Sequence, residues 1–310
     1  MTQPITPATP APETPPSPPS ERRNAMLAIG LILGALIGFD LMGVLVKMLI
    51  PRYAPQELAA YRNVLGVLPS VMLMLYTGEL RLRGSRLKLR QWRLAVVRGI
   101  VVAVAQIFWY AALGYLELAT IASLAQTNAL FSVLLGIVIF GDRVGPWRWT
   151  AIGVGFVGVL LILRPGAEAF SPYALMPIAA AVCYAYSAVT MRHFDDDASN
   201  ALIYLYSAGA SGIGAILLAA VTTDFSPIQS GWDAAAIFAM AMLGGSAVLL
   251  MMLAYRLTTP AVLAPFGYLG ILTSFALGYI FFGEAPIETL FPGVLLVVAA
   301  GGIILWRQNR

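Results

Sequence analysis

Four ionisable side chains stand inside long apolar segments in the first half of the chain: Asp40, Lys47, Arg62 and Arg98. Within a bilayer each of them would cost about 2.5–3.5 kcal/mol on insertion scales, so each needs a reason to be there. The guanidinium of Arg62 is a planar fork that matches a carboxylate or a phosphate. Asp40 can act as its counter-ion or carry a proton, and the two lie at depths that let them meet. A buried pair that only fixes helix packing is the alternative.

Uncharged polar and aromatic side chains in the same kind of segment indicate a cavity. Amides in lipid need partners, so we expect them to point inward, as cavity lining or as contacts between helices. Arg98 lies near a segment end, where reaching the lipid headgroups explains it, with an entrance-lining role as the alternative. The candidate ligand contacts are Asp40, Arg62, Gln106, Tyr110, Gln126, Asn128, Tyr184 and Tyr268.

Metal and catalytic sites are not expected. The chain has one cysteine, Cys183, and one histidine, His193, so no Cys/His metal site and no disulfide within the chain can be assembled. The histidine stands beside the acidic run 195–197, which is typical of a solvated loop. No HExxH motif and no Ser-His or Cys-His pairing at depth can be drawn. We therefore expect neither an enzyme nor a cofactor.

The composition indicates the elements that must position these side chains. Of the 310 residues 59% are hydrophobic and 11% are charged, whereas ordinary soluble domains carry about 25% charged residues. A bilayer-spanning helix needs about 20 mostly apolar residues. Such runs recur along the chain and predict an all-α, polytopic membrane protein with ten transmembrane helices, at roughly 25–49, 56–77, 94–114, 118–140, 147–164, 173–192, 200–222, 233–256, 260–282 and 288–306.

Lys and Arg between these helices predict the orientation. With the N-terminus inside, fourteen basic residues fall in cytoplasmic segments and three, Lys47, Arg52 and Arg164, on the opposite side. The basic cluster at 81–93 fixes its loop to the cytoplasm most firmly. We expect a bacterial inner-membrane protein with both termini cytoplasmic and an even number of helices.

The chain contains an internal repeat. Residues 119–142 (ATIASLAQTNALFSVLLGIVIFGD) and 261–284 (AVLAPFGYLGILTSFALGYIFFGE) align without gaps, with eight identities in 24 positions. Each copy is followed by one more helix. The repeat unit therefore has five helices, and because five is odd the second unit enters the membrane from the opposite side. We expect a Pro-rich disordered cytoplasmic tail at 1–24, a first repeat at 25–166 and a second at 167–310.

Several motifs give the chain a family resemblance. They are Tyr61-Arg62, Arg98-Gly99, the segment 111–119, the helix ends Phe140-Gly141-Asp142 and Phe282-Gly283-Glu284, and the stretch from Trp147 through Gly155 and Gly158 to Leu163-Arg164-Pro165-Gly166. Over residues 25–306 the chain resembles the drug/metabolite transporter superfamily with two EamA domains. Its stretch 147–166 looks like a bacterial subgroup labelled as S-adenosylmethionine-type uptake transporters. Asp142 departs from the glutamate usual in that pattern.

The resemblance implies a 5+5 inverted repeat and a secondary transporter. It would move a small organic metabolite, such as an amino acid, a nucleoside-like or an S-adenosylmethionine-like compound, by alternating access. Drug or metabolite efflux is the alternative, and a channel or a membrane scaffold is a rival from another class. The expected partners are the solute and membrane lipid, without nucleic acid, and a homodimer is left open.

Overall fold

The computed structural model describes residues 19–77, 89–141, 146–163, 171–194, 200–223, 225–257, 263 and 266–308, and all of its regular secondary structure is helical. The predicted tail at 1–24 lies outside these ranges up to residue 18. The first helix begins at Pro19, so residues 19–24 are helical although the sequence predicts disorder there. The predicted basic loop cluster at 81–88 and Asp142 also lie outside the described residues.

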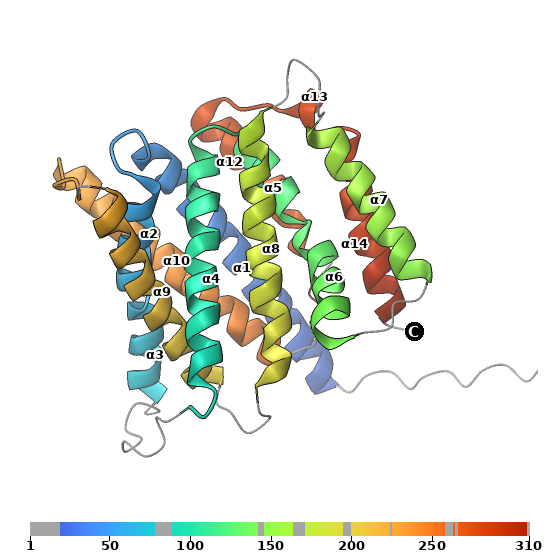
Figure 1. Cartoon of the computed structure of the whole chain (residues 1–310), viewed down its shortest axis with the longest axis horizontal. Coiled ribbons are helices and arrows are strands. Elements are labelled where there is room, and N and C mark those ends of the chain that lie inside the picture. The colour runs from blue at the N-terminus through green and yellow to red at the C-terminus, as the bar shows by residue number, and fades with distance from the viewer. Residues whose placement is uncertain are drawn as a thin grey trace, which may run out of the picture.

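The helices follow one another along the chain as Figure 1 shows. The first half contains α1 (Pro19–Leu49), α2 (Pro55–Leu65), α3 (Leu68–Thr77), α4 (Trp92–Leu113), α5 (Leu118–Ala125), α6 (Asn128–Phe140) and α7 (Pro146–Leu163). The second half contains η3 (Pro172–Ala174), α8 (Leu175–Val189), η4 (Thr190–His193), α9 (Asn200–Thr222), α10 (Gly231–Leu257), α12 (Leu269–Phe282), α13 (Ile287–Leu290) and α14 (Gly293–Gln308).

Six segments of the described chain are long and apolar enough to cross a membrane. They are Arg23–Leu49, Trp92–Leu113, Leu118–Phe140, Pro172–Val189, Leu205–Thr222 and Gly231–Ala254, and two shorter apolar helices cover Ile152–Ile162 and Leu269–Phe282. Large apolar side chains such as Val138 and Val221 stay exposed on the outside of the bundle, as lipid contact requires. The protein is thus a multi-pass helical membrane protein, and the count of ten stays a prediction.

Three of the predicted membrane helices are interrupted. The segment 56–77 divides into α2 and α3 at Gly66 and Val67, and the segment 118–140 divides into α5 and α6 at Gln126 and Thr127. The third, 288–306, divides into α13 and α14 at Phe291 and Pro292. At the first break Pro69 offers no N–H to continue the ladder, and α10 approaches so closely that a Cβ on Gly245 would lie 2.2 Å from the Gly66 carbonyl oxygen. Polar backbone exposed by such a break is tolerated in a membrane where neighbouring helices cover it.

The two copies of the sequence repeat end in the same way. Gly141 after α6 and Gly283 after α12 both have a left-handed backbone, with φ of 66° and 67°. Each glycine N–H bonds to the carbonyl oxygen four residues earlier, at 2.9 Å for Gly141 and 3.0 Å for Gly283. A side chain at either position would strain this backbone, which accounts for a glycine at both sites.

The helices pack so that elements from the two halves of the chain alternate in space. α1 lies against α10 and α12, α4 lies against α8 and α9, and α7 lies against α14. The largest cluster of buried apolar side chains joins α1, α2, α4 and α10, with Tyr53, Leu58, Tyr110 and Met240 among its members. Contacts between the halves therefore form most of the core.

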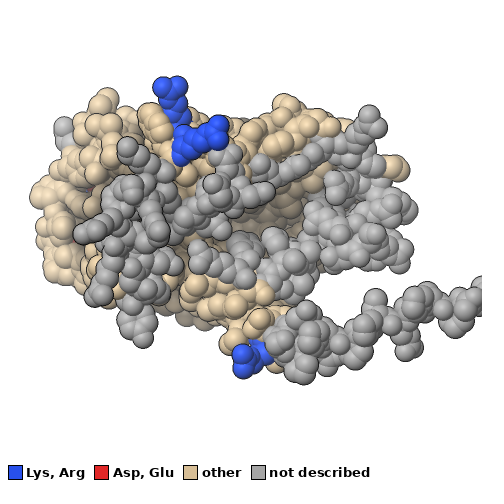
Figure 2. All heavy atoms as spheres, turned by 90° about the horizontal axis from the view of Figure 1, so that it is seen from below, with Lys and Arg blue, Asp and Glu red and all other residues tan. Residues whose placement is uncertain are grey.

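The bundle has two ends, which we call upper and lower as they are drawn in Figure 1. The upper end carries residues 50–54, 114–117, 225–230 and 283–286, and the lower end carries the start of α1 and the C-terminus. Seen from below, the described atoms of the lower face include protruding Lys and Arg side chains (Figure 2). This agrees with a cytoplasmic lower end, and the orientation stays a prediction.

Candidate functional site

Arg62 is the charged centre of a polar cluster on α2. Its Nη1 donates to Asn63 Oδ1 at 3.0 Å, and its Nη2 makes a long contact of 3.4 Å with the Gly244 carbonyl oxygen on α10. Its Nε–H is buried and has no hydrogen-bond partner among the described residues. No carboxylate of the described chain lies within ion-pair distance of it.

Asn63 and Gln106 hold the guanidinium in place. Asn63 Nδ2 donates to Gln106 Oε1 on α4 at 2.6 Å, and both amide side chains are buried. A chain of hydrogen bonds therefore runs from Arg62 through Asn63 to Gln106 and ties α2 to α4. The sequence predicts that Gln106 contacts a ligand, which stays a prediction. Its oxygen accepts from Asn63, so Gln106 also supports Arg62 through Asn63.

Tyr110 and Tyr184 complete the cluster. The guanidinium of Arg62 interacts electrostatically with both phenol groups. Tyr110 is fully buried, and its hydroxyl donates to the sulfur of Met42 at 3.7 Å. Arg62, Gln106, Tyr110 and Tyr184, which the sequence proposes separately, thus come from α2, α4 and α8 to one place.

Asp40 does not pair with Arg62, so the pairing suggested by their depths is wrong. The Asp40 carboxylate accepts hydrogen bonds from the hydroxyls of Ser274, at 2.6 Å, and Thr273 on α12. The Thr273 hydroxyl also lies 3.2 Å from the Gly270 carbonyl oxygen, which offers it a second acceptor. Matching depth does not fix the direction in which a side chain leaves its helix, and Asp40 points to α12.

The remaining candidates lie elsewhere. Gln126 Nε2 donates across to the Gly267 carbonyl oxygen at 3.2 Å, next to the equivalent repeat position, Tyr268. Asn128 accepts a hydrogen bond from Ser132 one turn later in α6, at 3.3 Å. Tyr268 packs against the apolar cluster of α5, α12, α13 and α14. No contact joins these three to the described atoms of the Arg62 cluster.

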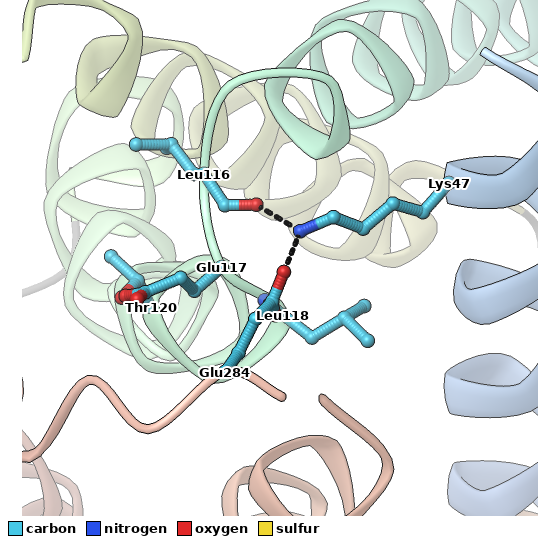
Figure 3. A network of polar contacts seen from close by, with 6 residues as sticks. All are labelled: Lys47, Leu116, Glu117, Leu118, Thr120 and Glu284. Carbon is cyan, nitrogen blue, oxygen red and sulfur yellow. Dashed lines mark hydrogen bonds and ion pairs between the residues drawn. The ribbon is translucent and has the colours of Figure 1, made fainter. Parts of the chain in front are cut away.

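A second polar group joins the two halves of the chain at the upper end (Figure 3). Lys47, at the end of α1, forms an ion pair with Glu284, which follows α12. The Lys47 ammonium also donates to the Leu116 carbonyl oxygen at 2.7 Å, and Glu284 accepts from the Leu118 N–H at 2.9 Å. We call the contact of Lys47 and Glu284 the upper latch.

Burial and neighbouring charges shape this latch. The side chains of Lys47 and Glu284 are only 17% and 13% exposed, and the Lys47 ammonium lies 5.2 Å from the centre of the Phe282 ring. Glu117 stands beside the pair, and burial together with the negative charge of Glu284 raises the pKa of its carboxyl above the usual range, partly offset by Thr120 and Lys47. The latch is thus partly shielded from water, and its one ammonium group, on Lys47, faces two carboxyl groups, on Glu284 and Glu117.

Another set of contacts crosses the upper end between α2 and the start of α10. Arg52 Nη2 lies 2.9 Å from Asp233 Oδ1, and the Tyr53 hydroxyl donates to Asp233 Oδ2 at 3.0 Å. Glu57, also buried, accepts from the Ser226 N–H at 2.9 Å. Both carboxylates come with polar partners from the other half, so this end of the bundle is tied together at two places.

A cavity of about 540 Å³ opens beside these contacts at the upper end. It lies between the α1–α2 turn, the α4–α5 turn and the start of α8. Tyr115 and Tyr173 line it with their rings stacked 3.7 Å apart. The cavity lies above the Arg62 cluster rather than at it, because its lining is made of residues 50–55 and of the upper ends of α4 and α8.

Arg98 is bound inside the protein and does not reach toward headgroups. Its side chain is 9% exposed, its Nε donates to the Ser187 carbonyl oxygen on α8 at 2.9 Å, and its guanidinium lies 5.5 Å from the Phe194 ring. The headgroup interpretation of Arg98 is therefore wrong. Its role in these contacts is to join α4 to α8 near the lower end.

The sequence analysis missed Asn63, Thr273 and the partners at the upper end. Asn63 carries a signal, since a second polar residue follows Arg62 directly within an apolar segment. Lys47 and Glu284 are 237 positions apart, so no local pattern links them. The signal that could have linked them is the inverted repeat. It places Glu284, which ends the second copy, at the same end of the bundle as Lys47.

Comparison with known proteins identifies related membrane proteins. Residues 26–164 match the EamA-like transporter family, and these residues lie within the first predicted repeat. The S-adenosylmethionine uptake transporter of Rickettsia bellii is 23% identical over 92% of this chain and 95% of its own length. The pseudopaline exporter CntI of Pseudomonas aeruginosa is 25% identical over 92% and 98%. The riboflavin transporter of Rhizobium johnstonii is 27% identical over 71% and 72%.

The fold also has a counterpart among solved structures. One crystal structure superposes with a TM-score of 0.60 at 19% identity, covering 95% of this chain and all of that chain. This likeness concerns the arrangement of the helices alone. The similar proteins with assigned roles are transporters rather than enzymes, in agreement with the sequence analysis.

Proposed function

We propose that the chain is a secondary transporter that moves a small organic metabolite across the bacterial inner membrane by alternating access. The match of residues 26–164 to the EamA-like transporter family supports this proposal. The solute would bind at the Arg62 cluster, and the two halves of the chain would move against each other to expose that cluster to either side. No cofactor takes part in this scheme.

The upper latch is the observation that carries this proposal. Lys47 comes from the first predicted repeat and Glu284 from the second, so the pair holds the two repeats together at one end only. In alternating access, contacts that close one side must break when that side opens. A partly exposed ion pair suits this task, because water and ions can replace each partner when it separates.

The inverted 5+5 arrangement gets support from the packing of corresponding helices. α1 packs on α10 and α12, and its counterpart in the second repeat, α8, packs on α4 and α6, which are the counterparts of α10 and α12. The left-handed glycines 141 and 283 end corresponding helices. On this basis α2 with α3, α5 with α6, and α13 with α14 each count as one membrane helix.

The names of the related proteins support a polar metabolite as the solute. Their names include S-adenosylmethionine uptake, riboflavin transport and pseudopaline export, so both solute and direction vary among them. We favour uptake of an amino-acid-like or nucleoside-like compound, and the exporter relative makes efflux the second candidate. The upper end would face the periplasm, because Lys and Arg side chains protrude among the described atoms of the lower face.

Cysteine labelling at the two ends tests alternating access. The native Cys183 is first replaced by alanine, and single cysteines are placed at Met176, which lines the upper cavity, and at His193, which is exposed near the lower end. A solute that drives transport should change the two labelling rates in opposite directions. If a solute crosses the membrane but leaves both labelling rates unchanged, the protein is a channel. If no solute moves at all, a scaffold is favoured.

A further inference from the structure

The Arg62 guanidinium forms no ion pair with a carboxylate of the described residues. It has five N–H donors, of which Nη1 bonds to Asn63 and Nη2 makes a long contact with Gly244. The Nε–H is buried without a partner among the described residues. A donor that is buried without a partner is unfavourable, and an anion bound at this edge of the guanidinium would satisfy it.

We propose that Arg62 binds the carboxylate of the transported solute through its Nε and Nη2 edge, so that the solute class is small carboxylates, including amino acids and their derivatives. This inference rests on the proposed transport function. The edge presents two parallel donors, which match the two oxygens of a carboxylate. One guanidinium neutralises a carboxylate fully, whereas a phosphate dianion would keep an uncompensated charge inside the membrane.

Gly244 and Met42 show where this carboxylate would bind. A Cβ placed on Gly244 would lie 3.1 Å from Arg62 Nε and 3.6 Å from Nη2, so the glycine leaves that edge uncovered on the α10 side. The same position is 2.5 Å from the Met42 sulfur, so the Met42 side chain takes up space beside the edge in this conformation. A methionine side chain is flexible and adapts to new neighbours, so the solute can displace it.

The phenol groups of Tyr110 and Tyr184 interact electrostatically with the same guanidinium. The Tyr110 hydroxyl donates to the Met42 sulfur, a weak acceptor, at 3.7 Å. When the solute displaces Met42, this hydroxyl is freed to donate to the incoming carboxylate. Binding thus exchanges one weak hydrogen bond for charge-assisted ones.

Thermal unfolding of the detergent-purified full chain tests the proposal with matched pairs of compounds. The pairs are L-methionine with L-methioninamide, S-adenosylmethionine with its decarboxylated amine, benzoate with benzamide, and AMP with adenosine for the phosphate alternative. We expect at least one carboxylate to raise the unfolding temperature and its neutral partner to fail. A ligand at a hundred times its dissociation constant gives an easily measured shift.

The variants then assign the effect to this edge. Arg62→Gln should weaken binding of the effective carboxylate at least ~30-fold, as expected when one partner of a buried charge pair is lost. Gly244→Ala should weaken it about tenfold while leaving the charge in place, because its methyl group crowds Nε. Gly209→Ala on α9, where an added Cβ meets nothing within 4 Å, is the matched control and should leave binding unchanged.

Four outcomes would overturn the proposal. They are equal shifts from acid and amide, binding that survives Arg62→Gln, stabilisation by AMP alone, and no shift from any carboxylate at tens of millimolar. Failure of the transport function itself has a different signature. If a neutral or cationic solute changes the cysteine labelling at the two ends in opposite directions while carboxylates do not, transport stands and the carboxylate inference falls.

Discussion

Neutralising Glu284 should open the upper end of the protein. Glu284→Gln keeps the size of the side chain and an oxygen for the Leu118 N–H, but removes the charge that holds Lys47. At the close approach of an ion pair, the attraction is about 5 kcal/mol gross for an effective dielectric constant of 20. Desolvation reduces the net value.

Partial burial sets the expected magnitude. Exposed pairs contribute about 0–1 kcal/mol, and removal of one partner from a buried pair costs about 3–5 kcal/mol. With side chains 17% and 13% exposed, the latch falls between these limits, and we take about 2 kcal/mol. In the proposed alternating access the latch breaks when the upper end opens, so the closed-to-open ratio should fall ~30-fold.

The assay is the labelling of a single cysteine below the latch. Met42 is buried and lies five residues before Lys47 on α1, about 7.5 Å further from the upper end. In Met42→Cys with Cys183→Ala, an impermeant maleimide added from the periplasmic side should react ~10- to 30-fold faster when Glu284→Gln is introduced. The unfolding temperature should change little by comparison, since the rest of the core is intact.

A double-mutant cycle identifies the pair as the cause. Lys47→Gln should accelerate labelling as Glu284→Gln does, and the double variant should add little to either. A change of less than twofold in the single variants, or effects that simply multiply in the double variant, would refute the role of the latch in closing this end.

Three further predictions concern packing, the Asp40 contact and pH. Gly245→Ala should lower the unfolding temperature by several degrees, because its methyl group would collide with the Gly66 backbone, and Gly209→Ala should leave that temperature unchanged. Equal unfolding temperatures for the two variants would contradict the close contact between the helices. Asp40→Asn should flatten the pH dependence of transport in proteoliposomes if Asp40 carries a proton and the Thr273 hydroxyl donates in turn to its carboxylate and to the Gly270 carbonyl oxygen. A pH profile identical to that of the parent protein would exclude Asp40 as a proton carrier. Glu117→Gln should stabilise the protein at pH 7, because burial and Glu284 raise the pKa of Glu117, and a raised carboxyl pKa lowers the stability of the folded state above that pKa. This gain in stability should disappear as the pH falls through the raised pKa toward 4.5. A gain that grows in acid would be inconsistent with this sign.

The membrane helices were predictable because each needs only a local run of apolar residues. The interruption at Gly66 was not predicted, since it depends on the approach of Gly245 from a helix far away in the sequence. The break at Gln126 and Thr127 has a local contribution that a closer analysis could find. The Thr127 hydroxyl donates to the Leu124 carbonyl oxygen at 2.6 Å, a side-chain contact that competes with the helical ladder.

The candidate site was predictable in its residue types and less so in its pairings. Membrane energetics alone singled out Arg62 and Asp40, and the structure gives each of them polar partners. Their mutual pairing failed because a helical wheel gives the relative directions within one helix but not the rotation of one helix against another. Gln126 and Asn128 form hydrogen bonds to neighbouring protein groups, as amides in lipid must. Their polarity alone therefore did not distinguish a residue that lines a cavity from one that holds helices together.

The position of Glu284 directly after α12 has an electrical consequence. The C-terminal end of a helix carries about half a negative charge, and the N–H of Glu284 satisfies only one carbonyl there, that of Gly278 at 3.1 Å. When Lys47 withdraws, the carboxylate and the helix end leave an uncompensated negative charge at the upper end, which faces the periplasm in the proposed orientation. Dissolved cations lower the energy of that open arrangement by screening, over a Debye length of about 8 Å at physiological ionic strength. The salinity outside the cell would thus act directly on the conformational balance of the protein.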